Sequence, residues 1–98
     1  MEMNEMSTFI KDYINENIKK IVDHPDDVEI NVSTSTKNVI IQIRVNDTDY
    51  GKVIGRKGNT IQSLKILTMA VKNTNYPEDK RKVSLELLED ETRNFSFK

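Results

Sequence analysis

Two glycines that enclose a pair of cationic residues constrain the fold of this chain more than any other feature. The chain has three glycines, and Gly55 and Gly58 stand on either side of Arg56 and Lys57. Glycine allows positive φ and carries no Cβ atom, so a tight turn can form here and a ligand can approach the backbone closely. The apolar residues before and after this segment predict that the turn joins two helices.

Helical periodicity is present on both sides of this turn and near the N-terminus. A short helix is expected over 50–54, after a polar loop whose last residues can cap it, and a longer one from residue 59 or 60 to 71 or 72. Apolar residues also recur at helical spacing from residue 9 to 22. Ser7 is the expected N-cap of that first helix, and Pro25 marks its end, because proline biases its predecessor out of the helical region.

Three segments alternate between apolar and polar residues as half-buried strands do. They span 28–32, 39–45 and 83–87. The first two follow each other across a short turn and should be antiparallel, whereas the third returns after two helices and should lie parallel to the second. The sequence therefore predicts an α+β domain of order α-β-β-α-α-β, with a three-stranded mixed sheet and all helices packed on one face.

The length of 98 residues suits one domain. We expect a flexible N-terminus over 1–6, the domain over 7–88 and a flexible C-terminal tail over 89–98. The chain has no cysteine, and no apolar run is long enough for a membrane span. A soluble, cytoplasmic protein without a membrane partner is the resulting expectation.

The distribution of charge points to one local anionic contact on a chain whose net charge is −1. No acidic residue occurs from 51 to 77, whereas that stretch contains five cations: Lys52, Arg56, Lys57, Lys65 and Lys72. Backbone N–H groups at the start of a helix also favour an anion. A sugar-phosphate backbone lying across the glycine loop fits this combination, although charge alone favours a solvated helix surface equally.

The segment from Val53 to Ile61 matches the signature V-I-G-x-x-G-x-x-I of KH domains at every specified position. With an additional helix and strand before the core, the element order resembles the type II, or bacterial, KH arrangement. Residues 23–28 and 51–55 are also similar to the small single-KH RNA-binding proteins of bacteria, the KhpA family. The resemblance extends over about 8–88.

The resemblance implies a function and a set of contact residues. In KH domains the G-x-x-G loop clamps the backbone of about four nucleotides of a single strand. Carried over by position, Lys52 lies at the entrance of the clamp, and apolar residues line the groove where bases rest. The implied RNA-binding residues are Lys52, Val53, Ile54, Gly55, Arg56, Lys57, Gly58 and Ile61, with Ile41 and Ile43 from the second strand.

Residues on the long helix suggest association between protein chains. Ile61, Leu64, Leu67 and Val71 make its expected core face. Ile66, Met69 and Ala70 project elsewhere, as the residues of an association surface do. The family resemblance implies a homodimer, or a heterodimer with a larger KH-containing protein.

The sequence gives less support to functions other than RNA binding. His24 is the single histidine, and its acidic sequence neighbours Asp23, Asp26 and Asp27 do not make a preorganised catalytic or metal site. We expect it to act as a turn and cap element, and we expect no catalytic site, metal or cofactor. Two alternatives to RNA binding stay open: an assembly adaptor that uses the KH fold for dimerisation, and a binder of single-stranded DNA.

Overall fold

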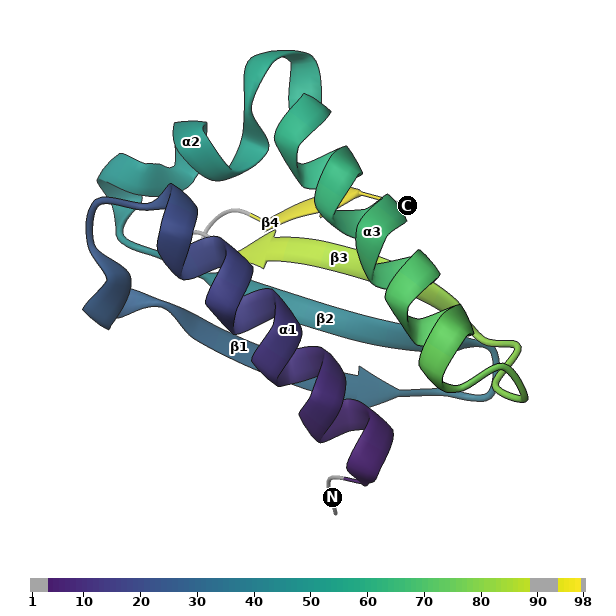
Figure 1. The fold of residues 1–98 in the computed structure, drawn as a ribbon. Helices are drawn as coiled ribbons and strands as arrows, with labels where there is room; N and C mark the ends of the chain where they lie inside the picture. The colour runs from purple at the N-terminus through teal and green to yellow at the C-terminus, as the bar shows by residue number, and fades with distance from the viewer. Residues whose placement is uncertain (1–3, 89–93, 98) are drawn as a thin grey trace.

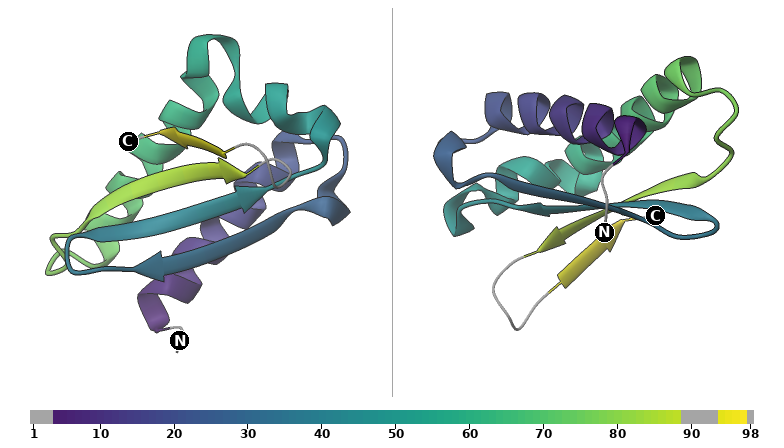
Figure 2. Two further views of the ribbon diagram at one scale, coloured as in Figure 1. Left: turned by 180° about the vertical axis from the view of Figure 1, so that it is seen from behind. Right: turned by 90° about the horizontal axis from the view of Figure 1, so that it is seen from below.

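A computed structural model describes residues 4–88 and 94–97 as a sheet with helices packed on one of its faces (Figures 1 and 2). The main elements are α1 (Glu5–Ile21), β1 (Glu29–Thr34), β2 (Asn38–Arg44), α2 (Tyr50–Ile54), α3 (Asn59–Asn75), β3 (Lys82–Leu88) and β4 (Asn94–Phe97). Short 3₁₀ helices lie at Pro25–Asp27, Asp47–Asp49 and Arg56–Gly58. The predicted α+β class and the order α-β-β-α-α-β are confirmed through β3.

The sheet has the strand order β1-β2-β3-β4 within the described residues. β1 pairs with β2 antiparallel and β2 pairs with β3 parallel, as predicted. β4 adds an antiparallel partner to the far edge of β3, where Leu85 pairs with Phe97 and Leu88 with Asn94. This strand was not predicted, because 89–98 was expected to form a flexible tail. The other residues of that expected tail, 89–93 and 98, lie outside the described residues.

α1 begins earlier than the sequence predicted. Its N-cap is Asn4, whose side-chain oxygen accepts a hydrogen bond of 2.8 Å from the backbone N–H of Ser7. Met6 is 6% exposed and belongs to the core, together with Ile10 and Ile14 one and two turns later. The expected flexible start therefore needs correction from residue 4 onward, whereas residues 1–3 lie outside the described part.

The core lies between the helices and one face of the sheet (Figure 2, right). β2 and β3 each present three alternating apolar residues to the helices: Val39, Ile41 and Ile43, and Val83, Leu85 and Leu87. Full burial of one such side chain contributes roughly 1.5–3 kcal/mol. None of the helices within residues 4–88 has the length and apolar character needed to cross a membrane.

The buried face of α3 differs from the prediction. Ile61 and Leu64 are buried as expected, but Leu67 is 51% exposed, and the core face continues through Thr68 and Lys72. Both polar side chains have partners: the Thr68 hydroxyl donates to the Leu64 carbonyl, and Lys72 Nζ donates to the carbonyl of Asp79 at 2.7 Å. These hydrogen bonds offset the cost of burying polar groups.

Candidate nucleic-acid interface

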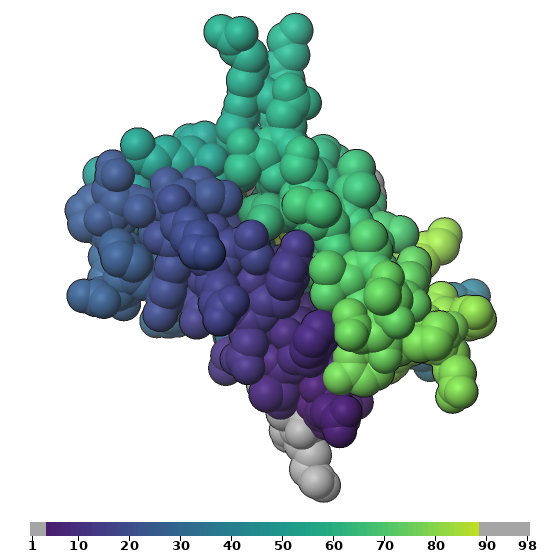
Figure 3. All heavy atoms as spheres, in the orientation of Figure 1, coloured from purple at the N-terminus to yellow at the C-terminus, as the bar shows by residue number. Residues whose placement is uncertain are grey.

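The loop between α2 and α3 contains three residues in the left-handed half of backbone space. Gly55 has φ +75° and ψ 176°, Lys57 has φ +56°, and Gly58 has φ +79°. The Gly58 N–H donates to the Gly55 carbonyl at 3.2 Å, which closes the turn. The loop forms the protrusion at the top of the molecule (Figures 1 and 3). Arg56 and Lys57 are exposed there.

Gly55 is required by a neighbour as well as by its own φ. A Cβ atom at this position would lie 2.1 Å from the Thr60 hydroxyl oxygen and 2.8 Å from the Thr60 backbone nitrogen. The same atom added to Gly51 would have no heavy atom within 4 Å. Thr60 therefore shapes the loop, a role that sequence reasoning missed because the motif specifies no residue at its position.

The start of α3 leaves backbone donors facing the loop. Its N-cap is Gly58, which has no side chain to accept a hydrogen bond from the first turn. α3 is 17 residues long, so the aligned peptide dipoles add a partial positive charge at this end. Among residues 4–88, neither the Arg56 guanidinium nor the Lys57 ammonium group has a hydrogen bond or ion pair. The loop thus combines backbone N–H groups and two available cations, which suits a phosphate group.

Lys52 lies on α2 beside the loop, as expected, but it is already paired. Its Nζ lies 3.3 Å from a carboxylate oxygen of Asp23, and the two side chains are 47% and 67% exposed. An ion pair this exposed contributes at most about 1 kcal/mol. Lys52 can therefore exchange this partner for another anion at little cost.

The apolar residues assigned to the site separate into two groups. Ile54 is half-buried beside the loop, whereas Val53 and Ile61 are fully buried and hold α2 and α3 on the core. Ile41 and Ile43 are also 0% exposed, so the expectation that they line a groove needs correction. They face the helices from β2, which is an interior strand of the sheet.

A buried carboxylate fixes the start of α2 against the end of α1. Asp49 is fully buried, and its oxygens accept hydrogen bonds from the N–H groups of Asp23 at 3.1 Å and His24 at 3.0 Å. His24 Nδ1 lies 3.1 Å from the same carboxylate. Burial acts to raise the pKa of Asp49, but these hydrogen bonds outweigh it and hold that pKa below its ordinary value. His24 lies in the turn, as predicted.

The first residue of α2 is anchored as well. The Tyr50 hydroxyl donates a hydrogen bond to the carbonyl of Leu88 at the end of β3. The last residues of the loop before α2 were expected to cap this helix. Asp49 does occupy the N-cap position, but its carboxylate makes no capping hydrogen bond and binds the α1–β1 connection. A helix of five residues is thereby held at its first turn by contacts far away in sequence.

Comparison with known proteins identifies this arrangement. The family model described as "KhpA/KhpB, KH domain" matches residues 11–87, from α1 almost to the end of β3. The chain belongs to the KhpA/KhpB family of KH domains. The matched residues include the loop 55–58, whereas β4 lies beyond them.

Curated proteins similar to this KH domain carry the name of the same family. It is 38% identical over 73 residues to the RNA-binding protein KhpA of Leifsonia xyli subsp. xyli, with 74% of this chain and 88% of the relative covered. The proteins of the same name from Chlamydia caviae and Mycobacterium tuberculosis are 37% identical over 81 residues and 36% identical over 66. The match to the Chlamydia caviae protein covers 83% of this chain and 99% of that protein. The match to the Mycobacterium tuberculosis protein covers 67% of this chain and 82% of that protein.

The residues expected to mediate association divide between two faces of α3. Ile66 is 63% exposed, and Ala70 is exposed one turn later. Met69 is half-buried and lines cavities beside β3. Leu67, which was expected in the core, is exposed instead. The apolar surface of this KH domain on α3 therefore comprises Ile66, Leu67 and Ala70.

Proposed function

We propose that this KH domain binds single-stranded RNA, whose backbone lies across the loop 55–58. The observation that carries the proposal is the loop itself: positive φ at Gly55, Lys57 and Gly58, two exposed cations and an α3 N-terminus without a side-chain cap. The name of the curated relatives, RNA-binding protein KhpA, supports RNA as the ligand. The proposal includes the cytoplasmic location expected from the sequence.

In this proposal the phosphate oxygens accept hydrogen bonds from backbone N–H groups at the start of α3. Arg56 and Lys57 contact neighbouring phosphates, and the half-buried Ile54 provides apolar surface beside them. Contacts to phosphates position a strand without reading its bases, so the sequence preference should be weak. With about three cations at the loop, the slope of log K against log salt should be shallow, about −0.7 per phosphate neutralised.

The test is binding of short fluorescent RNA, measured by anisotropy, with the double variant Arg56→Asp, Lys57→Asp. The matched control is Lys19→Asp, Lys20→Asp, which makes the same charge change at exposed positions at the end of α1. Circular dichroism checks that both variants are folded. We expect binding to be lost in the loop variant and largely kept in the control. Equal binding by the loop variant and wild type would refute the proposal.

A DNA strand of the same sequence distinguishes the nucleic acids. The contacts described above involve phosphates, and the 2′-hydroxyl is what separates RNA from DNA at a given site. Tighter binding of the RNA supports the proposal. Equal or tighter binding of the DNA favours the single-stranded DNA alternative.

The exposed apolar surface on α3 favours a second function, association with another KH domain. Ile66 and Leu67 are 63% and 51% exposed and lie next to each other, and Ala70 extends the same surface. We propose a homodimer, or a heterodimer with a larger KH-containing protein, through Ile66, Leu67 and Ala70. Ile66→Glu should halve the mass measured by light scattering, whereas Thr8→Glu, at an exposed position on α1, should leave it unchanged.

The two proposed functions are distinguished by which variant loses RNA binding and which loses association. An RNA binder requires Arg56 and Lys57, and a pure adaptor requires Ile66. If the loop variant keeps every property of the wild type and only Ile66→Glu loses one, the adaptor alternative is favoured. An unchanged mass for Ile66→Glu excludes this surface from the interface.

A further inference from the structure

The fold brings one acidic side chain next to the cations of the loop 55–58, although the sequence has no acidic residue from 51 to 77. Asp23 lies between the end of α1 and the 3₁₀ helix Pro25–Asp27. One of its carboxylate oxygens is 3.3 Å from Nζ of Lys52 on α2. Lys52 precedes Gly55, where the loop begins, by less than one helical turn. A distant part of the chain therefore supplies the counter-ion of this lysine.

The position of Asp23 is fixed through its backbone. Asp49, the N-cap residue of α2, accepts a hydrogen bond of 3.1 Å from the N–H of Asp23 and one of 3.0 Å from the N–H of His24. Asp49 is fully buried, so water does not compete for these hydrogen bonds. The start of α2 thus holds residue 23 by its backbone and faces its carboxylate with Lys52. The ion pair is in place before any ligand binds.

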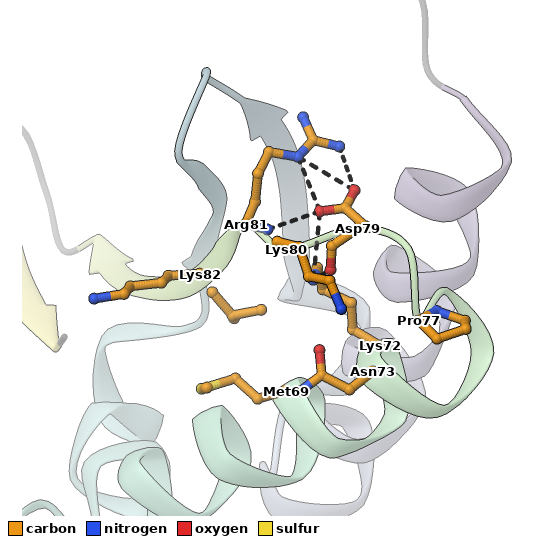
Figure 4. Close-up of a pocket in the computed structure, with 9 residues that line it drawn as sticks. Met69, Lys72, Asn73, Pro77, Asp79, Lys80, Arg81 and Lys82 are labelled. Carbon is orange, nitrogen blue, oxygen red and sulfur yellow. Dashed lines mark hydrogen bonds and ion pairs between the residues drawn. The ribbon is translucent and has the colours of Figure 1, made fainter.

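The Asp23–Lys52 pair is exposed, unlike the charged cluster at the far end of α3. In that cluster Arg81 and Lys72 converge on Asp79, at 2.6 Å and 3.4 Å from its carboxylate oxygens (Figure 4). The Lys72 side chain is 1% exposed and that of Asp79 is 17% exposed, so these ion pairs belong to the fold. Asp23 and Lys52 are both open to solvent, and a dissolved anion can reach the lysine.

Asp23 neutralises one of the three cations at the loop. Among residues 4–88, the Arg56 guanidinium and the Lys57 ammonium group have no ion pair, whereas Lys52 has Asp23. A phosphate that contacts Lys52 must therefore displace Asp23 and leave its carboxylate unpaired beside a polyanion. A lysine that pairs with phosphate releases counterions from the nucleic acid, and a lysine that stays with Asp23 releases none. The ion pair therefore opposes both the affinity for a phosphate chain and its salt dependence.

We propose that Asp23 is an internal competitor of phosphate, which limits RNA binding by occupying Lys52 in the free domain. The inference rests on the proposed binding of RNA across the loop 55–58 and adds the regulation of that site. A strand already held by Arg56, Lys57 and the start of α3 presents its next phosphate to Lys52 at a high effective concentration. Such a strand can displace Asp23, because an exposed ion pair is weak.

The test is binding of short fluorescent RNA, measured by anisotropy, with wild type, Asp23→Asn and Asp26→Asn. Asp26→Asn is the matched control, because it makes the same charge change at an exposed position in the same α1–β1 connection. Asparagine keeps the backbone N–H that Asp49 binds, and circular dichroism checks that both variants are folded. We expect Asp23→Asn to bind roughly 2- to 5-fold more tightly than wild type at low salt. Its slope of log K against log salt should be steeper by up to about 0.7.

The variant Lys52→Ala shows whether the effect of Asp23 passes through Lys52. Without this lysine Asp23 has no cation to occupy, so adding Asp23→Asn should tighten binding less than in the wild-type background and about as much as Asp26→Asn does. The difference between the two gains is the coupling of a double-mutant cycle. An equal gain in both backgrounds overturns the inference, because overall charge is then the cause. Unchanged or weaker binding by Asp23→Asn alone also overturns it.

The loop variant Arg56→Asp, Lys57→Asp separates this inference from the proposed function. If the loop variant loses RNA binding and Asp23→Asn binds as wild type does, the clamp stands and the competition by Asp23 is refuted. If the loop variant binds as wild type does, the proposed function is refuted, and the inference falls with it. Loss of binding in the loop variant together with a Lys52-dependent gain in Asp23→Asn supports both.

Discussion

Replacing Gly55 by alanine should destabilise the KH domain, whereas the same change at Gly51 should not. Gly55 has φ +75° with ψ 176°, a conformation almost confined to glycine, which costs another residue about 1–3 kcal/mol. The added Cβ would also lie 2.1 Å from the Thr60 hydroxyl oxygen, and overpacking of this kind costs about 1–3 kcal/mol. Together the loss is roughly 2–6 kcal/mol.

Gly51 provides the matched control because it lies in α2 with open space where its Cβ would be. Alanine loses less backbone entropy there, so Gly51→Ala should stabilise the domain by about 0.4–1 kcal/mol. A domain of this size has a free energy of unfolding of roughly 5–15 kcal/mol, so most of this range leaves Gly55→Ala folded.

Urea unfolding followed by circular dichroism measures both variants, and thermal unfolding provides a second readout. A loss of 2 kcal/mol corresponds to a fall in Tm of about 8–16 °C. If Gly55→Ala is as stable as wild type, the loop backbone does not have this conformation in solution. If Gly51→Ala is destabilised equally, the loss reflects glycine removal in general, and the reasoning from Thr60 fails.

Three further predictions concern the buried groups. Asp79→Asn leaves Lys72 buried without its counter-ion and should cost about 3–5 kcal/mol in urea unfolding, whereas Lys72→Met should cost less because the charge is removed. Because the pKa of Asp49 is lowered in the folded state, its carboxylate adds to the free energy of unfolding above about pH 4, and this contribution is lost as the pH falls further. Asp49→Asn should therefore have a smaller free energy of unfolding at neutral pH, and that free energy should fall less than that of wild type in acid. Ile41→Ala should cost about 2–5 kcal/mol but leave RNA affinity unchanged at temperatures where it is folded, whereas a selective loss of affinity would return Ile41 to the groove.

The sequence predicted the order of elements and the loop because both depend on local patterns. Alternation identified β1, β2 and β3, and the two glycines around Arg56 and Lys57 located the loop. Periodicity does not tell which face of a strand the helices cover or which strand lies at an edge. This is why Ile41 was assigned both to a strand and to a groove that it does not line.

The errors on α3 arise from contacts between distant residues. A pattern of hydrophobicity favours Leu67 and Val71 for the core, but Thr68 and Lys72 are buried instead. Lys72 can be buried because Asp79 meets it from the loop before β3, which no helical projection includes. The role of Asp49 was missed for the same reason, since its carboxylate binds N–H groups 25 and 26 residues earlier in the chain.

The incomplete cover of β3 bears on the tendency of this chain to aggregate. An exposed strand edge offers unpaired N–H and C=O groups to the same strand of another molecule, which can begin edge-to-edge assembly. β4 pairs with Leu85–Leu88 and closes that half of the edge, whereas the first residues of β3 have no partner on that side among the described residues. Lys82 lies at this open part, and a charged side chain there opposes the approach of an identical strand. The charge of Lys82 would thus keep free copies of the chain apart at this edge.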